Sequence, residues 1–386
     1  MTIVHIITRM IVGGAQENTL LTCRGLKELG HRVILLTGPS RGPEGSLLED
    51  MNRTGCEIRE IPSLLRNPNP FADIHAYRAI GRQLADIKPQ VVHTHSSKAG
   101  ILGRKAAWKQ RVGAVIHTIH GLPFHPYQSE LVNQAWIKLE QYAAHRCHSI
   151  ICVAKAMQSQ ALTAGVGRPE QYEIVYSGMQ IEQYLRSSAN ADGRARLGIE
   201  KDAIVIGTVA RLQPLKGHDD LLKIAGDLLN HNPRIHFLWI GDGVFRPRLQ
   251  EEIDRRNWSR RFTLAGLVPP QSVGEMLSAM DIMAHPSYRE GLPRAVVQGM
   301  LAELPAVVYD CDGAAEICRS GSTGILVETG NVPALKSALL QLADNAAQRR
   351  QFGAAGKKLA AELFDWRIMV NQLDRLYRKV CDKNAN

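Results

Sequence analysis

The fold is decided by the stretch His285-Pro-Ser-Tyr-Arg-Glu-Gly-Leu-Pro-Arg-Ala-Val-Val-Gln-Gly-Met300. The apolar run that ends before it, Asp281-Ile-Met-Ala284, is typical of a buried strand, and Pro293 is expected as the first residue of a helix. The turn Glu290-Gly291-Leu292 should therefore present backbone N–H groups at a helix N-terminus, which is an anion site. Glu290 and Gln298 lie about two helical turns apart and can face one ligand. Because a carboxylate repels phosphate, a sugar hydroxyl is the better partner of Glu290, and a nucleotide sugar would supply both groups.

These residues resemble the signature of the retaining family 4 glycosyltransferases, in which two glutamates are separated by seven residues and Gly-Leu-Pro or a similar run follows the first. Glu290 occupies the first position here, but Gln298 stands at the second. In that family the first glutamate contacts the donor sugar and the second holds the ribose hydroxyls. Gln298 can still exchange hydrogen bonds with a diol, although without the assistance of a charge.

Length and composition are those of an ordinary globular protein with two domains. The chain has 386 residues, of which 45% are hydrophobic and 22% charged. No apolar run approaches the roughly 18 residues of a membrane span, and a strand predicted from Thr2 leaves no room for a signal peptide. We therefore expect a cytoplasmic protein. Its seven cysteines lack metal-type spacing and are predicted to be reduced and mostly buried.

Positive charge is concentrated in the first half of the chain. Residues 1–180 carry 20 Lys and Arg against 13 Asp and Glu, and the remainder carries 27 against 24. Nucleic-acid motifs are absent, so an anionic membrane surface or an acidic substrate is the better partner. The alternative to a membrane or substrate contact is that the basic residues lie on a helix face that is simply solvated. We expect a peripheral contact with the inner face of the cytoplasmic membrane through one predicted helix that carries cations beside an aromatic residue: Lys98, Arg104, Lys105, Trp108, Lys109 and Arg111.

The first half alternates β-rich runs with amphipathic segments, which predicts a doubly wound parallel sheet. Ligands of such sheets bind at the carboxyl ends of the strands. The expected strands are Ile3–Ile7, Arg32–Thr37, Glu57–Ile61, Val91–Thr94, Ala114–Thr118, Ser149–Val153 and Glu173–Val175.

Two groups of residues follow these strands. Gly13 and Gly14 form a loop that enters a helix and resembles the family loop that abuts the donor phosphate or sugar; a plain tight turn is the alternative. His117 and His120 resemble the family's strand-end histidine motif, in which the residue matching His120 lies near the donor sugar. The pair His93 and His95 suggests packing or acceptor contacts rather than zinc, since no carboxylate completes a ligand set.

The second half begins with an apolar strand at Ala203–Ala210, followed by a turn that carries Arg211 and Lys216. Two cations ahead of a helix can meet a diphosphate, and they resemble the family's phosphate clamp. Two later strands end at Gly241 and Val268, where the family holds the nucleobase through backbone groups. The run Asp310-Cys-Asp312 resembles an ordinary family loop rather than a metal motif.

The resemblance spans the whole chain and implies an α/β fold of the GT-B type, with two Rossmann-like domains facing a cleft. We expect an acceptor-side domain over residues 1–180, a nucleotide-sugar domain over 181–365, and a C-terminal helix over 366–386 that packs on the first domain. The implied enzyme is a retaining hexosyl- or N-acetylhexosaminyl-transferase that needs neither a metal nor a cofactor. It moves a sugar from a nucleotide donor, with a UDP-sugar favoured, to a glycan or a lipid-linked acceptor. The expected process is the synthesis of a cell-envelope polysaccharide. A GT-B epimerase and a non-catalytic nucleotide-sugar-binding protein are the alternatives.

Overall fold

The computed structural model describes residues 1–40, 45–185 and 193–385. The chain divides into two compact units, one made of Met1–Met179 with Trp366–Asn386 and the other of Gln180–Asp365. Of the polar stretch Ser187–Gly193, expected to be a linker, residues 187–192 lie outside the described part, and Gly193 begins a short helix.

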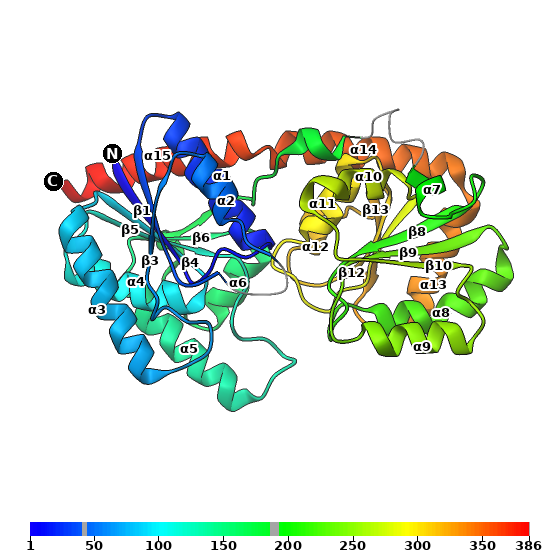
Figure 1. Cartoon of the computed structure of the whole chain (residues 1–386), viewed down its shortest axis with the longest axis horizontal. Coiled ribbons are helices and arrows are strands. Elements are labelled where there is room, and N and C mark those ends of the chain that lie inside the picture. The colour runs from blue at the N-terminus through cyan, green and yellow to red at the C-terminus, as the bar shows by residue number, and fades with distance from the viewer. Residues whose placement is uncertain (41–44, 186–192, 386) are drawn as a thin grey trace. The chain divides into compact units, whose positions relative to one another are not determined.

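The first unit is built on a seven-stranded parallel sheet with the strand order β3-β2-β1-β4-β5-β6-β7 (Figure 1). Its strands are β1 (Thr2–Ile7), β2 (Arg32–Thr37), β3 (Glu57–Glu60), β4 (Val91–His95), β5 (Ala114–Ile119), β6 (Ser149–Cys152) and β7 (Tyr172–Ile174). Its helices are α1 (Gly14–Glu28), α2 (Leu48–Arg53), α3 (Pro70–Ile87), α4 (Ser97–Lys109), α5 (Glu130–Ala144), α6 (Lys155–Thr163) and α15 (Trp366–Ala385), with a 3-10 turn at Pro169–Gln171.

Two hydrophobic clusters cover the two faces of this sheet. Alternate residues of a strand point to opposite faces, so Ile3 packs with α1 and α15, whereas Val4 packs with α3 and α4. The C-terminal helix α15 packs on this unit, as the resemblance implied, and its residues Trp366, Met369 and Tyr377 are all less than 5% exposed. Its first residue, Trp366, donates a backbone hydrogen bond to the carbonyl oxygen of Met179 at 3.1 Å.

The second unit is built on a six-stranded parallel sheet with the strand order β10-β9-β8-β11-β12-β13. Its strands are β8 (Ile204–Val209), β9 (Ile235–Ile240), β10 (Phe262–Gly266), β11 (Ile282–His285), β12 (Ala306–Asp310) and β13 (Gly324–Glu328). Its helices are α7 (Gly193–Arg196), α8 (His218–His231), α9 (Arg246–Arg255), α10 (Val273–Ser278), α11 (Arg294–Leu301), α12 (Ala314–Ile317), α13 (Val332–Asp344) and α14 (Ala346–Phe364), with 3-10 turns at Ile181–Tyr184 and Pro270–Ser272.

Three sequence-based expectations need correction. Pro293 is the N-cap of α11 rather than its first residue, because its ψ of 84° is not helical. Arg104 is not a surface cation: it is fully buried, and its guanidinium contacts Glu140 at 2.6 Å. Lys98 is also drawn inward, where it bonds Asp73 at 2.7 Å.

No helix in the described ranges combines the length and the apolar character that crossing a bilayer requires.

Candidate functional site

Most of the predicted donor-site residues lie at one edge of the six-stranded sheet. They follow the carboxyl ends of four adjacent strands, β10, β9, β8 and β11, which is the edge where parallel sheets bind ligands (Figure 1). Val268 comes after β10, Gly241 after β9, Arg211 and Lys216 after β8, and Glu290 with Gly291, Leu292 and Gln298 after β11.

A three-residue charged group forms the centre of this edge. The Lys216 ammonium lies 2.5 Å from Oε1 of Glu290, and Nε2 of His285 lies 3.0 Å from the same oxygen. The side chains of Lys216 and Glu290 are each only 16% exposed, and that of His285 is 4% exposed. Both contacts fall on Oε1, so neither of them occupies Oε2 of Glu290.

Backbone geometry brings the loop after β8 onto the end of β11. Gly217 has a φ of +74°, and a Cβ at this position would lie 1.9 Å from the carbonyl oxygen of Pro286. Only glycine fits such an approach. The preceding residue but one, Leu215, also has a positive φ, of 67°, and its carbonyl oxygen accepts hydrogen bonds from Ser287 Oγ at 3.1 Å and Tyr288 N at 2.9 Å. These contacts fix Lys216 beside Glu290.

The electrostatics of the group keep Glu290 ionised. Burial by itself would raise the pKa of Glu290, but the charge of Lys216 and the hydrogen bond from His285 outweigh it, so the pKa lies well below its usual value. The backbone N–H of Glu290 donates to Oδ2 of Asp312 at 2.7 Å, which anchors the turn. Asp312 therefore serves the loop, in agreement with the interpretation of Asp310-Cys-Asp312 as a structural segment.

The other residues of this edge are placed as follows. Arg211 is exposed directly after β8, where the neighbouring Leu212 N–H donates to the carbonyl of Asp242 at 3.0 Å. Gly241 has a φ of +131° and packs against the carbonyl of Ala210, while Val268 is half-buried. Gln298 donates from Nε2 to the hydroxyl of Tyr184 at 2.9 Å, a contact that sequence reasoning did not anticipate.

The remaining candidates belong to the first unit. Gly13 is the N-cap of α1 and Gly14 its first residue, as expected for a glycine loop that enters a helix. His120 follows β5, and its Nε2 lies 3.0 Å from Nδ1 of His95. The Nε2 of His95 in turn lies 3.0 Å from Nδ1 of His5, a residue that the sequence analysis missed because a histidine in the middle of an apolar strand looks like core.

Metal-ligand spacing occurs once within the described ranges, at His5, His93 and His95, whose nitrogens lie within 4.8 Å of one another. His93 already contacts Tyr377 Oη from Nδ1 at 2.5 Å and Thr118 Oγ1 from Nε2 at 2.7 Å. The nitrogens of His5 and His95 face each other. Each ring nitrogen of His93 therefore already has a partner, and His5 and His95 contact each other.

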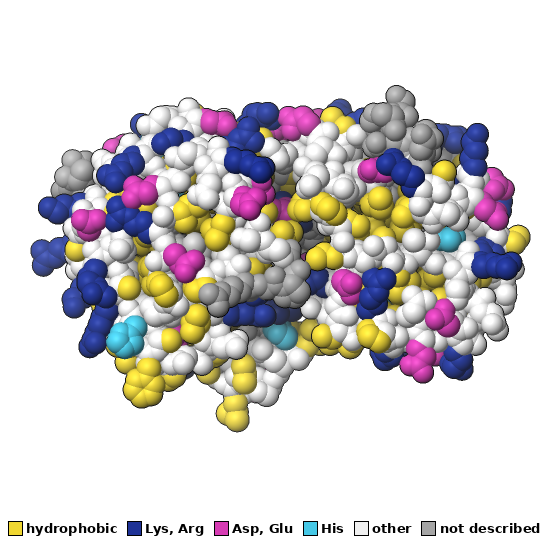
Figure 2. Space-filling model, in the orientation of Figure 1, with side chains coloured by type: hydrophobic (Ala, Val, Ile, Leu, Met, Phe, Trp, Pro, Cys, Tyr) yellow, Lys and Arg dark blue, Asp and Glu magenta, His cyan; other side chains and the backbone are white. Residues whose placement is uncertain are grey.

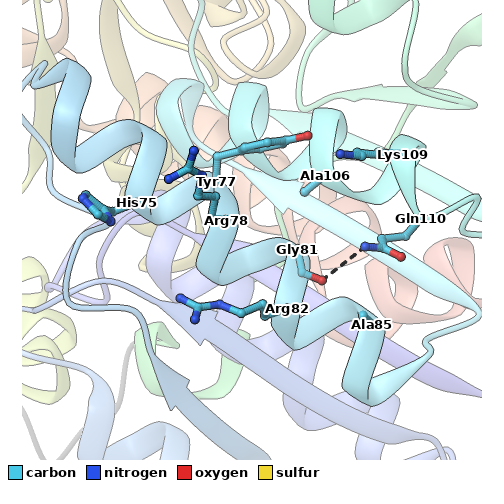
Figure 3. A pocket seen from close by; sticks show the side chains of 9 residues that line it. All are labelled: His75, Tyr77, Arg78, Gly81, Arg82, Ala85, Ala106, Lys109 and Gln110. Atoms are coloured by element: carbon cyan, nitrogen blue, oxygen red, sulfur yellow. Dashed lines mark hydrogen bonds between the residues drawn. The ribbon is translucent and has the colours of Figure 1, made fainter.

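A basic hollow lies between α3 and α4 on the first unit. Its volume is about 560 Å³, and Figure 3 shows cationic side chains from both helices at its rim, together with the hydrogen bond from Gln110 Nε2 to the carbonyl of Gly81. Arg78, Arg82 and Lys109 are exposed. The cationic surface that the sequence placed on one helix is therefore formed by two, without Lys98 and Arg104.

Two known family models match the two halves of the chain. The model of glycosyltransferase family 4 matches residues 12–183, and the model of glycosyl transferases group 1 matches residues 190–359. The chain is a family 4 glycosyltransferase. Its two Rossmann-like domains are those of the GT-B fold, as the sequence predicted.

Several known glycosyltransferases align along most of this one. An Escherichia coli protein described as UDP-Gal:alpha-D-GlcNAc-diphosphoundecaprenol alpha-1,3-galactosyltransferase is 26% identical over 347 residues, covering 89% of this chain and 88% of its own. The alpha-monoglucosyldiacylglycerol synthase of Acholeplasma laidlawii is 26% identical over 82% of this chain and 81% of its own. The crystal structure of Anabaena HepE in complex with UDP superposes with a TM-score of 0.84 at 20% identity, covering 98% of this chain and 100% of that one.

Proposed function

We propose that this glycosyltransferase moves a hexose or N-acetylhexosamine from a UDP-sugar to a lipid-linked glycan, with retention of anomeric configuration, in cell-envelope polysaccharide synthesis. The observation that carries the proposal is the contact of Lys216 and His285 with Glu290 at the carboxyl edge of the six-stranded sheet. One relative described as acting on a diphosphoundecaprenol-linked sugar, and another described as an alpha-monoglucosyldiacylglycerol synthase, support a lipid-linked acceptor.

In the proposed reaction the bond between the sugar and the diphosphate breaks, and negative charge develops on the departing UDP. Lys216 and Arg211 would stabilise that charge, together with the peptide N–H groups at Gly291 and Leu292 ahead of α11. Glu290, held anionic, would accept a hydrogen bond from a donor-sugar hydroxyl through Oε2. The acceptor hydroxyl attacks from the face that the leaving group vacates, so no side chain is needed as a nucleophile.

We also propose that the reaction needs no divalent metal, because fixed cations take the place that a metal would have beside the diphosphate. In this arrangement Gln298, Gly241 and Val268 would line the nucleoside part of the site. The family resemblance assigns Gly13, Gly14 and His120 of the first unit to the donor as well. The bond between Gln298 and Tyr184 orients the amide. Replacing Gln298 with Glu should tighten UDP binding in calorimetry if this side chain contacts the ribose.

The experiment that tests the function measures release of the nucleoside diphosphate from UDP-galactose, UDP-glucose and UDP-N-acetylglucosamine, and from GDP- and ADP-sugars for comparison. A polyprenyl-diphosphate-linked sugar serves as acceptor. We expect acceptor-dependent release of UDP that persists in EDTA, and a product whose anomeric coupling constant in NMR matches that of the donor. Epimerised sugar formed from donor alone would instead indicate an epimerase, and binding without turnover would indicate a non-catalytic protein.

A lipid-linked acceptor requires that the enzyme reach a membrane, and we propose that α3, α4 and α5 contact anionic lipid. Phe71 is 82% exposed at the start of α3, and Leu131 is 85% exposed at the start of α5. Figure 2 shows hydrophobic and basic side chains together over this part of the surface. Apolar side chains that insert beside exposed Arg78 and Arg82 are typical of a peripheral contact.

Sedimentation with liposomes tests this contact. We expect the protein to bind vesicles that contain an anionic phospholipid and to bind zwitterionic vesicles weakly. The variant Phe71→Ser/Leu131→Ser should lose binding, whereas Val244→Ser, which changes a residue 78% exposed in the second unit, should retain it. Equal partitioning onto both kinds of vesicle would contradict the proposal.

A further inference from the structure

Three imidazoles, of which His5 and His95 are buried and His120 is half-buried, form a hydrogen-bonded chain that runs from the middle of the seven-stranded sheet to its carboxyl edge. His5 lies within β1, His95 ends β4, and His120 follows β5. The nitrogen–nitrogen distance is 3.0 Å for both links, His5 Nδ1 to His95 Nε2 and His95 Nδ1 to His120 Nε2. The ring centroids are 5.3 Å apart in both pairs, with interplanar angles of 15° and 27°. At these separations the rings meet end to end, with a nitrogen of each ring at hydrogen-bonding distance from a nitrogen of the next.

The order of the strands produces this arrangement. β1, β4 and β5 are neighbours, and His5 is in register with His93, two residues before His95 on the same face of β4. Side chains of His5 and His95 are 0% exposed. Burial lowers the pKa of His5 to about 3 and that of His95 well below its ordinary value. Both rings are therefore neutral at physiological pH, and each carries a single ring proton.

With His5 and His95 neutral, and His120 taken in its neutral form, the chain has two proton patterns. Either each ring is protonated at Nδ1 and donates toward His120, or each is protonated at Nε2 and donates toward His5. The two patterns differ at the buried end, because Nε2 of His5 has no hydrogen-bond partner. A buried N–H without an acceptor is rarer in proteins than an acceptor without a donor. The pattern with protons on Nδ1 is therefore favoured, and His5 is left with a bare Nε2.

We propose that His5 and His95 are positioning residues that fix the tautomer of His120, so that its Nε2 accepts from His95 and its Nδ1 carries the proton. The ring nitrogen that bears the proton decides which hydrogen bond His120 can offer to a sugar. This inference rests on the proposed function, in which His120 lies near the donor sugar. His93 is a lateral support: its ring is 4.3 Å from that of His95 and is held by Tyr377 and Thr118.

The closing experiment reads the tautomer directly, without donor or acceptor. The full chain is labelled with ¹⁵N-histidine. The ring-nitrogen signals of His120 are assigned as those that disappear in the His120→Gln variant. We expect a protonated Nδ1 and an unprotonated Nε2. A protonated Nε2, or averaged shifts from two exchanging tautomers, would overturn the proposal. Elemental analysis after dialysis is the second readout. One equivalent of bound metal per chain would overturn the proposal in favour of a metal site at His5, His93 and His95.

A matched pair of variants separates the two links of the chain. In His95→Asn the amide can occupy the place of Nδ1 and keep a partner for His120, whereas in His95→Gln it reaches the place of Nε2 and keeps only the partner of His5. For His95→Gln we expect averaged His120 shifts and a kcat reduced roughly tenfold, with little change in KM. This loss is comparable to that caused by removing an outer partner of a functional histidine. For His95→Asn we expect a smaller loss of kcat. Unchanged His120 shifts in His95→Gln would overturn the proposal.

The two readouts distinguish the two ideas. If His95→Gln averages the His120 shifts while kcat stays at the wild-type value, the chain fixes the tautomer but the role given to His120 in catalysis is wrong. If either variant unfolds, as judged by circular dichroism, the wild-type tautomer and the other variant still decide the outcome.

Discussion

The contact between Lys216 and Glu290 should be visible in both the stability and the turnover of the enzyme. Lys216→Met keeps most of the side-chain volume but removes the ammonium that lies 2.5 Å from Oε1. Removing one partner of a buried ion pair costs about 3–5 kcal/mol. Each side chain here is 16% exposed, and His285 still contacts the carboxylate, so we expect a loss at the lower end, about 3 kcal/mol.

A double-mutant cycle isolates the pair from its surroundings. Lys216→Met, Glu290→Gln and the double variant are unfolded in urea at pH 7.5, and the free energies of unfolding are compared. We expect a coupling energy of roughly 1–3 kcal/mol, since the double variant no longer buries an unpaired charge. Lys336→Met is the matched control: Lys336 contacts Asp227 at 2.7 Å, but the side chains are 36% and 62% exposed, so its loss should be below about 1 kcal/mol.

The dependence on pH gives the sign of the effect. The pKa of Glu290 is lowered in the folded state, so its stabilising contribution is present above its unfolded pKa, near 4.5, and is lost as pH falls toward the folded value. The difference in stability between wild type and Lys216→Met should therefore be greatest above about pH 5 and should shrink on acidification. A difference that stays constant from pH 7 to pH 4, or a cycle in which the two losses simply add, would refute the pairing.

Turnover provides the functional half of this prediction. Removing one fixed donor that stabilises developing charge costs about 2.7–4 kcal/mol in the transition state, or 100- to 1000-fold in kcat. Lys216→Met should show this loss at a temperature at which circular dichroism confirms that it is folded. Lys216→Arg, which retains the charge, should recover part of it. Near-normal turnover of Lys216→Met would refute the role in catalysis even if the stability result held.

Three further predictions concern other residues. Arg211→Ala should lower kcat/KM at least a hundredfold in the UDP-release assay, because an exposed cation after β8 is lost from the diphosphate, and a loss below tenfold would exclude it from the site. Glu140→Ala leaves Arg104 unpaired in the core and should lower the free energy of unfolding by about 3–5 kcal/mol, whereas a loss under 1 kcal/mol would contradict a buried pair. His218 and His236 have pKa values lowered to about 4 by burial, so stability should fall as pH drops from about 6.5 to 4, and His236→Asn should flatten this slope in urea titrations.

The sequence predicted the strands well for a physical reason. Parallel strands are covered on both faces, so they appear as continuous apolar runs, and runs such as Arg32–Thr37 coincide with the observed bounds. The strand that was not predicted, β13, lies at the edge of its sheet and is covered less completely, with a half-exposed Ile325 and Leu326. The sequence also could not show that Arg104 is buried while Lys105 is exposed. Both are cations on one helix, and the helix turns the first inward and the second outward.

The sequence predicted site residues that belong to local motifs. It missed those that come together only through the pairing of distant strands. The signature from Glu290 to Gln298 and the cations after β8 are local, so the sequence placed them on one ligand. Their direct contact depends on the approach of Gly217 to Pro286, about seventy residues apart in the chain, which no local pattern encodes. His5 was missed for the same reason: its link to His95 exists only because β1 and β4 are adjacent.

The contact between Lys216 and Glu290 also bears on how the donor would bind. The ammonium of Lys216 is paired with a carboxylate that two groups hold in its ionised form. A diphosphate that approaches must share Lys216 with Glu290, and a new anion near Glu290 is repelled unless a further cation is present. In the proposed site Arg211, an exposed cation after β8, would supply that charge. In the proposed reaction the charge on the diphosphate increases as the sugar departs, so attraction to Lys216 would grow most in the transition state, and this difference from the ground state would accelerate the reaction.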